Sequence, residues 1–395
     1  MIYRKFRGDF LFTGLGFAGG DKVLITDDAG VIIAVEEASA HQDAAYFPGT
    51  ICPGFVNTHC HLELSWMQGV IPERTGMIDF LLAVMKTPRV AIEDILKAAR
   101  VAQESMLHKG IVAVGDICNT DVTAGLKQEG QLYYHNFIEA MGLDEDLADL
   151  RMKAARETFN RFAAGYSLPM ASNSIVPHAP YSVSESLLKL ITGFPGNHLL
   201  TVHNQEHAAE NELFLKGSGD FHRLYTAIGF DATRLSIQNR SGLQHMLPFF
   251  HKNQSVIFVH NVETGTDDIA ALHEAIAKGL ACTLCLCPNA NLYINGKLPD
   301  LNMLAECGID ITIGTDSLAS NKQLDILEEL KTIHHAERNI EVAALLKWAT
   351  INGAKALGIE TETGSFAAGK QPGIVWLKGV NEKSIEASAT AERLL

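Results

Sequence analysis

The sequence predicts an α/β protein: a (β/α)8 barrel of the TIM type with a small β-sandwich domain built from both termini. Short apolar runs alternate with helix-like stretches through the middle of the chain, a pattern typical of βαβ units in a parallel sheet. Both ends consist instead of short strands and turns. The expected division is residues 1–54 and 359–395 for the β domain and residues 55–358 for the barrel.

The middle of the chain contains eight apolar runs that we expect to form the barrel strands. They are residues 51–57, 111–117, 132–138, 174–177, 199–203, 256–260, 281–285 and 311–315. The runs are apolar throughout, as expected for strands buried on both faces. Helix-like stretches separate them, for example residues 78–108, 147–162, 267–278 and 324–338. Eight such units indicate a closed barrel.

The two ends of the chain contain short strand-like segments and turns, which predict one small sheet. Strand-like segments are expected at residues 9–13, 22–26 and 31–36, and again at 373–377. The Asp27-Asp28-Ala29-Gly30 stretch indicates a hairpin between two of them.

The composition excludes several classes of function. The 395 residues include 32 basic and 46 acidic side chains, for a formal net charge of −14, which argues against a nucleic-acid polymer as partner. No apolar run is long enough to cross a membrane, and the first residues do not resemble a secretory signal, so a cytoplasmic protein is expected. We interpret the seven cysteines as free, reduced thiols.

Histidines close the first and fifth apolar runs. His59 and His61 follow the first run, and because residues i and i+2 of a strand point the same way, both imidazoles can face the barrel axis. Two neutral imidazoles on one face make half of a zinc site. His203 closes the fifth run, and Glu206 lies in the loop above it.

Further polar residues close the sixth and eighth runs, with His260 and Asp316 respectively. A carboxylate directly after an apolar strand is costly unless it is paired or bound to a metal. A single histidine at a strand end is more often structural than a ligand. The joint pattern is what indicates a site, because all these strand ends meet at the same mouth of a barrel.

These segments resemble the amidohydrolase superfamily, in particular its mononuclear deaminase and chlorohydrolase branch. The resemblance is carried by Pro53-Gly54-Phe55-Val56-Asn57-Thr58-His59-Cys60-His61, His203-x-x-Glu206, His260 and Gly314-Thr315-Asp316-Ser317. It implies that His59, His61, His203 and Asp316 hold one divalent metal, with Zn²⁺ expected and Fe²⁺ as the alternative. It also implies that His260 and Asp316 orient the attacking water and that Glu206 shuttles protons.

The fourth run departs from the two-metal members of the superfamily, which carry a bridging carboxylated lysine there. Residues 174–182 contain no lysine, and His178 stands near that place. This favours one metal and a deaminase. In related nucleoside deaminases, the histidine of a similar Pro-His-x-Pro-Tyr segment contacts the heterocycle; the alternative is a structural histidine in a turn bounded by prolines.

A second pattern, His61-x-Glu63 with Cys282-x-x-Cys285, superficially matches the cytidine-deaminase signature. Alanine rather than proline precedes the cysteine pair, and the two parts lie far apart in the chain. That signature belongs to a much smaller fold, so we interpret the cysteines as buried strand residues.

The loops beyond the first histidine pair resemble those of aminodeoxyfutalosine deaminase-like proteins, which act on an adenine nucleoside in menaquinone biosynthesis. The segments are residues 62–72, 75–80, 287–291 and 315–321. One departure puts the substrate in doubt: Asn289 stands where a substrate-facing arginine is commoner. Glu63 and Trp66 would line the substrate pocket; the alternatives are a solvated carboxylate and an aromatic that packs the loop.

The resulting expectation is a metal-dependent hydrolytic deaminase of an aminoheterocycle, such as 6-aminodeoxyfutalosine. We also expect a small-molecule substrate and a homodimer. A hydrolase that removes chloride, or one that acts on a guanine-like base or an amidine, is the alternative. A catalytically silent scaffold is a third possibility, but such proteins typically lose ligands, and the whole set is present here.

Overall fold

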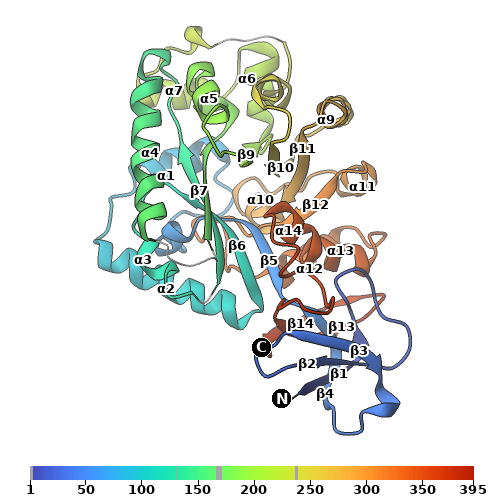
Figure 1. The fold of residues 1–395 in the computed structure, drawn as a ribbon. Coiled ribbons are helices and arrows are strands. Elements are labelled where there is room, and N and C mark those ends of the chain that lie inside the picture. The colour runs from blue at the N-terminus through green and yellow to red at the C-terminus, as the bar shows by residue number, and fades with distance from the viewer. Residues whose placement is uncertain (1–2, 131, 166–170, 236–238) are drawn as a thin grey trace.

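The computed structural model describes residues 3–130, 132–165, 171–235 and 239–395 (Figure 1). Its centre consists of two four-stranded sheets, in the orders β5-β6-β7-β8 and β12-β11-β10-β9. Neighbouring strands are parallel in both. The strands are β5 (Phe55–Cys60), β6 (Ile111–Cys118), β7 (Tyr133–Ala140), β8 (Ala171–Pro177), β9 (Leu199–Asn204), β10 (Ser255–His260), β11 (Ala281–Leu286) and β12 (Asp310–Ile313).

Main-chain hydrogen bonds join the two sheets at both seams. Between β8 and β9, the amide of His203 donates to the carbonyl of His178 at 2.9 Å. Between β12 and β5, the amides of Thr315 and Asp316 donate to the carbonyl of His59 at 3.0 and 3.1 Å. The α/β barrel predicted from the alternating runs is therefore confirmed. Predicted site residues lie at both seams: His203 at one, and His59 and Asp316 at the other.

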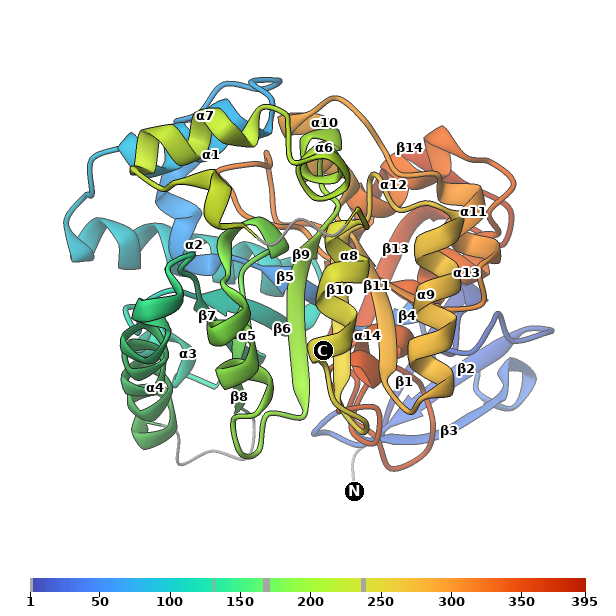
Figure 2. The same cartoon turned by 90° about the horizontal axis from the view of Figure 1, so that it is seen from above.

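Helices surround the strands, as the view from above shows (Figure 2). They are α1 (Met77–Lys86), α2 (Ile92–His108), α3 (Ala124–Lys127), α4 (Ala148–Gly165), α5 (Glu185–Thr192), α6 (Ala208–Lys216), α7 (Phe221–Ile228), α8 (Gly242–Met246), α9 (Thr266–Ala277), α10 (Pro288–Ile294), α11 (Leu301–Glu306), α12 (Ile326–Ala336), α13 (Val342–Trp348) and α14 (Ile351–Ala356). Short 3-10 turns are η1 (Ala38–Ala40), η2 (Leu62–Met67), η3 (Glu145–Leu147), η4 (Pro180–Ser182), η5 (Ala232–Arg234) and η6 (Leu247–Phe249).

Strands from both ends of the chain form one six-stranded sheet in the order β14-β13-β4-β1-β2-β3. Their bounds are β1 (Arg4–Leu11), β2 (Lys22–Thr26), β3 (Ile32–Glu37), β4 (Ala45–Pro53), β13 (Ile374–Val380) and β14 (Ile385–Arg393). The predicted hairpin is confirmed, because β2 and β3 pair antiparallel and the amide of Gly30 donates to Asp27 at 3.2 Å. We propose that the two domains divide at residues 54 and 358.

Two sequence predictions about elements were wrong in their bounds. The run at 51–57 is the end of β4 and the start of β5, which belong to different sheets. Gly54 separates them, because a Cβ there would lie 2.3 Å from Val112 and 2.5 Å from the carbonyl of Pro372. The helix predicted over 78–108 is two helices, α1 and α2. Pro88 lies in the break, and proline disfavours helical backbone before it and lacks an amide donor.

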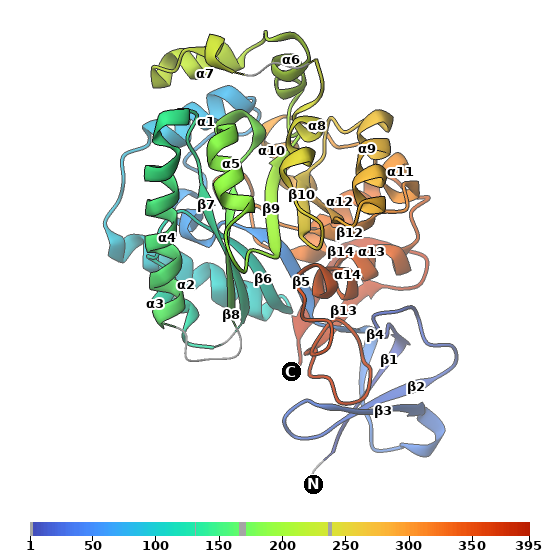
Figure 3. The same cartoon turned by 45° about the horizontal axis from the view of Figure 1, so that its top comes forward.

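Helices α6 and α7 lie on the opposite side of the molecule from the terminal sheet (Figure 3), and they contribute to an apolar cluster there. We call it the cap cluster; its buried members are Met67, Ile71, Met77, Ile78, Phe80, Ala179, Tyr181, Ala209, Leu213, Phe214, Phe221, Leu224, Tyr225, Ile294 and Ala319. It joins α1, α6 and α7 to residues that follow barrel strands. No helix in the described part of the chain is long and apolar enough to cross a membrane.

Candidate metal centre and active site

The first two predicted ligands lie at the end of β5. His59 is fully buried and His61, at the start of η2, is 7% exposed. Their Nε2 atoms are 3.2 Å apart. The strand holds both rings on one side because its side chains alternate.

His203 and Asp316 bring their ligand atoms to the same point from the other sheet. The Nε2 atom of His203 lies 3.3 Å from Nε2 of His61. Oδ1 of Asp316 lies 3.2 Å from Nε2 of His61 and 3.6 Å from Nε2 of His59. A tetrahedral ion with bonds of about 2.0–2.1 Å needs ligand atoms about 3.3 Å apart. The three imidazoles therefore fit one divalent metal ion, and the Asp316 carboxylate lies beside two of them.

Burial and neighbouring groups hold His203 and Asp316 in the protonation states that binding a metal would require. Burial, with the nearby imidazoles, keeps the pKa of His203 well below its usual value, so the ring is neutral. Burial alone would raise the pKa of Asp316, but hydrogen bonding to His59 and the imidazoles of His61 and His260 lower it. The carboxyl group is therefore ionised and can bind a cation.

Further hydrogen bonds orient two of the candidate ligands, His203 and Asp316. The carbonyl of His178 lies 2.8 Å from Nδ1 of His203 and accepts a hydrogen bond from it, which leaves Nε2 unprotonated and able to bind a metal. The hydroxyl of Ser320 donates to Oδ2 of Asp316. Such partners fix the tautomer and the rotamer of a ligand before the ion arrives.

The main chain around the site is tightly built and strained. Gln205, His260 and Asp316 have φ angles of 45°, 78° and 55°, in the left-handed region that side chains other than glycine rarely adopt. A Cβ at Gly314 would lie 2.7 Å from the Cβ of His59. Backbone strain of this kind clusters at functional sites, where the surrounding structure sustains it.

Glu206 and His260 lie together beside the ligands. Oε2 of Glu206 is 3.6 Å from Nε2 of His260, and the His260 ring centroid is 5.7 Å from that of His59. Burial, and then the charge of Asp316, raises the pKa of Glu206 well above its usual value. Burial lowers the pKa of His260 to about 3. A protonated carboxyl beside a neutral imidazole is a set suited to acid–base chemistry.

The three predicted substrate residues lie in different settings. Glu63 is buried, and its carboxylate accepts hydrogen bonds from the amides of Asn119 and Thr120 at 2.9 and 3.2 Å and from the Thr120 hydroxyl at 2.8 Å. Trp66 is partly buried against the cap cluster. His178 is partly exposed; its Nδ1 lies 2.6 Å from the Ser182 hydroxyl. Glu63 therefore anchors a loop, whereas Trp66 and His178 border the mouth. Contact of any of the three with substrate stays a prediction.

Glu139 was missed by the sequence reasoning. It lies near the end of β7 at the same mouth, and its buried Oε1 lies 3.7 Å from Nδ1 of His203, with no hydrogen-bond partner among the described residues. Glu139, His178 and His203 form a second group of clustered ligand-type atoms. The signal was present, because the rule that a carboxylate ending a buried strand needs a partner applies to Glu139 as it does to Asp316.

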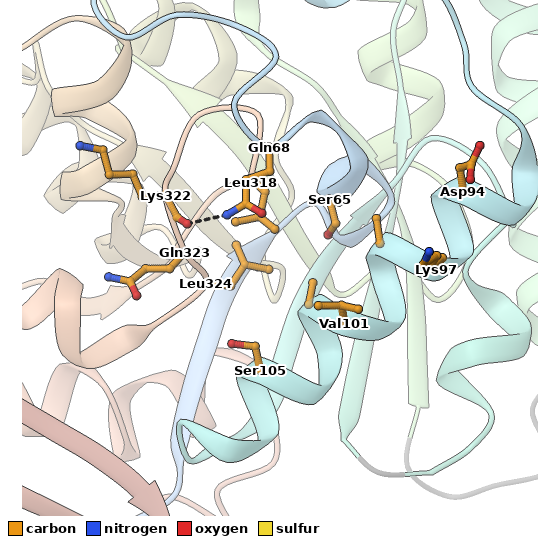
Figure 4. Close-up of a pocket in the computed structure, with 12 residues that line it drawn as sticks. Ser65, Gln68, Asp94, Lys97, Val101, Ser105, Leu318, Lys322, Gln323 and Leu324 are labelled. Atoms are coloured by element: carbon orange, nitrogen blue, oxygen red, sulfur yellow. Dashed lines mark hydrogen bonds between the residues drawn. The ribbon is translucent and has the colours of Figure 1, made fainter.

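A separate hollow of about 440 Å³ lies outside this centre, between η2, α2 and the 318–324 loop (Figure 4). Ser65, Val101 and Leu318 are among its lining residues, and none of the four ligand-type side chains lines it. At this hollow, the side-chain amide of Gln68 donates a hydrogen bond to the carbonyl of Lys322 at 2.8 Å. The hollow thus borders the loops that follow His61 and Asp316 without reaching the ligand atoms.

An α/β barrel with ligand-type histidines and a carboxylate at its mouth defines the class of metal-dependent barrel enzymes. The model of the Amidohydrolase family matches residues 50–392, and the chain belongs to this family.

Relatives and solved structures agree with this assignment. An adenosine deaminase of Helicobacter pylori is 26% identical over 361 residues, which cover 90% of this chain and 85% of the relative. An aminodeoxyfutalosine deaminase of Deinococcus radiodurans is 25% identical over 375 residues, covering 89% and 85%. The crystal structure of Helicobacter pylori aminofutalosine deaminase in complex with methylthio-coformycin superposes with a TM-score of 0.82 at 23% identity, covering 96% and 93%. This last likeness shows the shared fold.

Proposed function

We propose that the protein is a metal-dependent hydrolytic deaminase that replaces an amino group on a nitrogen heterocycle with oxygen and releases ammonia. The observation that carries the proposal is the convergence of three imidazole Nε2 atoms and the Asp316 carboxylate, with Glu206 and His260 beside them. The deaminase relatives support the reaction class.

We propose Zn²⁺ as the ion, held by His59, His61, His203 and Asp316, because three imidazoles and a carboxylate at tetrahedral spacing suit it. Iron(II) is the alternative, since the same ligands accept it. When bound, a divalent ion supplies a water nucleophile at neutral pH by lowering the pKa of water from 15.7 to about 7.

The side chains of this chain would perform the proton transfers. His260 directs Nε2 into the site and would orient the attacking water, together with Asp316. Glu206, protonated because burial raises its pKa, would give its proton to the ring nitrogen beside the attacked carbon. It would then take the two protons of the attacking water in turn, passing the first to the leaving amine and keeping the second, so that the carboxyl group ends protonated as it began.

We propose an adenine nucleoside as the substrate, specifically 6-aminodeoxyfutalosine, and thus a place in menaquinone biosynthesis. The Deinococcus radiodurans relative carries the name of that activity. A panel of 6-aminodeoxyfutalosine, adenosine, 5′-methylthioadenosine, guanine and a chlorinated triazine tests the choice, with ammonia and chloride measured separately. Chloride release without ammonia release would overturn the deaminase proposal.

Glu206→Gln tests the acid–base role, because it keeps the shape and removes the transferable proton. We expect unchanged metal content and a kcat reduced by roughly 10²–10⁴-fold. Glu212→Gln, an exposed glutamate on α6, is the matched control and should have full activity. If Glu206→Gln keeps more than about a tenth of kcat, Glu206 is not the shuttle.

We also propose that the protein is a cytoplasmic homodimer. Sedimentation velocity of the purified chain tests the dimer directly, and a species with the mass of one chain would contradict it.

A further inference from the structure

The short helix α10 contacts both members of the acid–base pair. Asn291, fully buried in its first turn, has Nδ2 3.0 Å from Nδ1 of His260. Asn295, the residue that caps the helix, donates from Nδ2 to the carbonyl of Glu206 at 3.2 Å. Residues four apart lie on one face of a helix, so a single face of α10 holds Glu206 and His260.

The contact at Nδ1 selects a tautomer for His260. A neutral imidazole has one N–H and one lone pair, so an amide that donates to Nδ1 leaves the proton on Nε2. Nε2 is buried, lacks a hydrogen-bond partner among the described residues, and lies 3.6 Å from a carboxyl oxygen of Glu206. A proton on Nε2 faces that carboxyl oxygen favourably. The contact at Nδ1 therefore selects the Nε2–H form.

The helix that bears Asn291 is itself fixed from both ends. The amide of Asn289 donates to Oε2 of the buried Glu329 on α12 at 2.8 Å. The hydroxyl of Tyr293 donates to the carbonyl of Ile71 at 2.6 Å, which ties α10 to the loop before α1. A helix held in this way can place an amide within a few tenths of an ångström, as positioning a catalytic group requires.

We propose that α10 is the positioning element of the acid–base pair, and that Asn291 is a positioning residue that holds His260 as the Nε2–H tautomer, aimed at the attacking water. Asn295 fixes the main chain of Glu206 from the same face. The inference rests on the proposed function for its catalytic consequence, but the tautomer itself can be measured without substrate.

The experiment is ¹⁵N NMR of histidine-labelled, zinc-loaded protein, with the His260 signals assigned by their loss in His260→Asn. We expect an unprotonated Nδ1 in the wild type and a protonated Nδ1 in Asn291→Asp, because a carboxylate only accepts hydrogen bonds.

Asn291→Leu, similar in volume and without an amide, should keep the metal and lower kcat at least about tenfold with little change in KM. Asn352→Ala is the control, because that helical asparagine donates to the carbonyl of Ile311 away from the mouth.

Three results would overturn the proposal: a protonated Nδ1 in the wild type, the same tautomer in Asn291→Asp as in the wild type, or full kcat in Asn291→Leu. Metal content and circular dichroism identify a variant that fails to fold, in which case Asn291→Asp alone decides. If no deaminase substrate is found, the NMR outcome still decides the tautomer, so the two proposals fail separately.

Discussion

Glu210 is a second buried carboxyl group close to Glu206, on the first turn of α6. One of its oxygens accepts from the amide of Gln205 at 3.0 Å, and the other, Oε2, has no hydrogen-bond partner among the described residues. Burial raises the pKa of Glu210 to about 8. In the folded protein, Glu210 is therefore protonated at neutral pH. Its uncharged carboxyl group accepts a hydrogen bond from the loop that contains Glu206.

This protonation predicts a pH dependence of stability. The unfolded chain loses the Glu210 proton near pH 4.3, whereas the folded protein keeps it to about pH 8. The contribution to stability is thus fully present below about pH 4.3 and is lost as the pH rises through about 8. Glu210→Gln cannot ionise, so its melting temperature should fall less than that of the wild type between pH 6 and pH 9, as measured by scanning calorimetry.

Glu212→Gln provides the comparison, because Glu212 lies on the same helix but is exposed. It should follow the wild-type pH profile. If Glu210→Gln follows that profile as well, Glu210 is ionised in the folded protein at neutral pH.

Residues of the site differ in how far the sequence could predict them. Five site residues lie at the ends of apolar runs: His59, His61, His203, His260 and Asp316. Because the strand ends of a barrel meet at one mouth, this pattern was enough to predict that they lie together. Asn291 and Asn295 lie on a short helix whose contact with β10 and β9 depends on tertiary packing, and asparagine carries no distinctive pattern.

At the scale of elements, a buried ion pair connects η2, β6 and α3. Asp116 on β6 accepts from the amide of Leu62, the residue after the candidate ligand His61, at 2.7 Å. Its other oxygen pairs with the ammonium group of Lys127, which also donates to Oδ1 of Asn136 at 2.7 Å. Both charged side chains are almost fully buried. This pair therefore fixes the segment that follows the candidate ligands His59 and His61.

Lys127→Met should be strongly destabilising, because it leaves the Asp116 carboxylate buried without a counter-charge. Breaking such a pair from one side costs about 3–5 kcal/mol. Urea unfolding measures the loss, and metal content should fall as well, since the loop after His61 loses its anchor. Lys278→Met, which removes an exposed pair with Glu274, is the control and should leave the unfolding curve unchanged. An unaltered Lys127→Met curve would mean that Asp116 is satisfied without the lysine.

The types of the elements followed from the sequence, but their connections did not. Apolar runs with the right period predicted the strands, yet a run cannot show that the chain changes sheets at Gly54 or that a helix breaks before α2. The Asp116–Lys127 pair also went unpredicted, because a lysine on a short helix gives no sign that it will be buried.

At the scale of the whole molecule, the candidate metal centre lies where the two sheets meet. His59 and His61 come from the sheet β5-β6-β7-β8, and His203 and Asp316 from the sheet β12-β11-β10-β9. An ion held by all four would cross-link the halves of the barrel at its mouth. The terminal sheet, at the far side from the cap cluster, does not contribute to this link (Figure 3).

Metal removal should therefore destabilise the whole barrel as well as abolish activity. A ligand that binds only the folded state stabilises it by RT ln(1 + [L]/Kd), or about 4 kcal/mol at a thousandfold excess over Kd. We expect the melting temperature to fall on chelation and to recover when Zn²⁺ is restored. His61→Asn, which lacks one ligand, should melt at the temperature of the chelated wild type and respond little to chelator, because it has no tightly bound ion to lose. If chelation removes the ion and abolishes activity while the melting temperature is unchanged, the two sheets are held together by their hydrogen-bonded seams and core alone, and the ion serves only the chemistry.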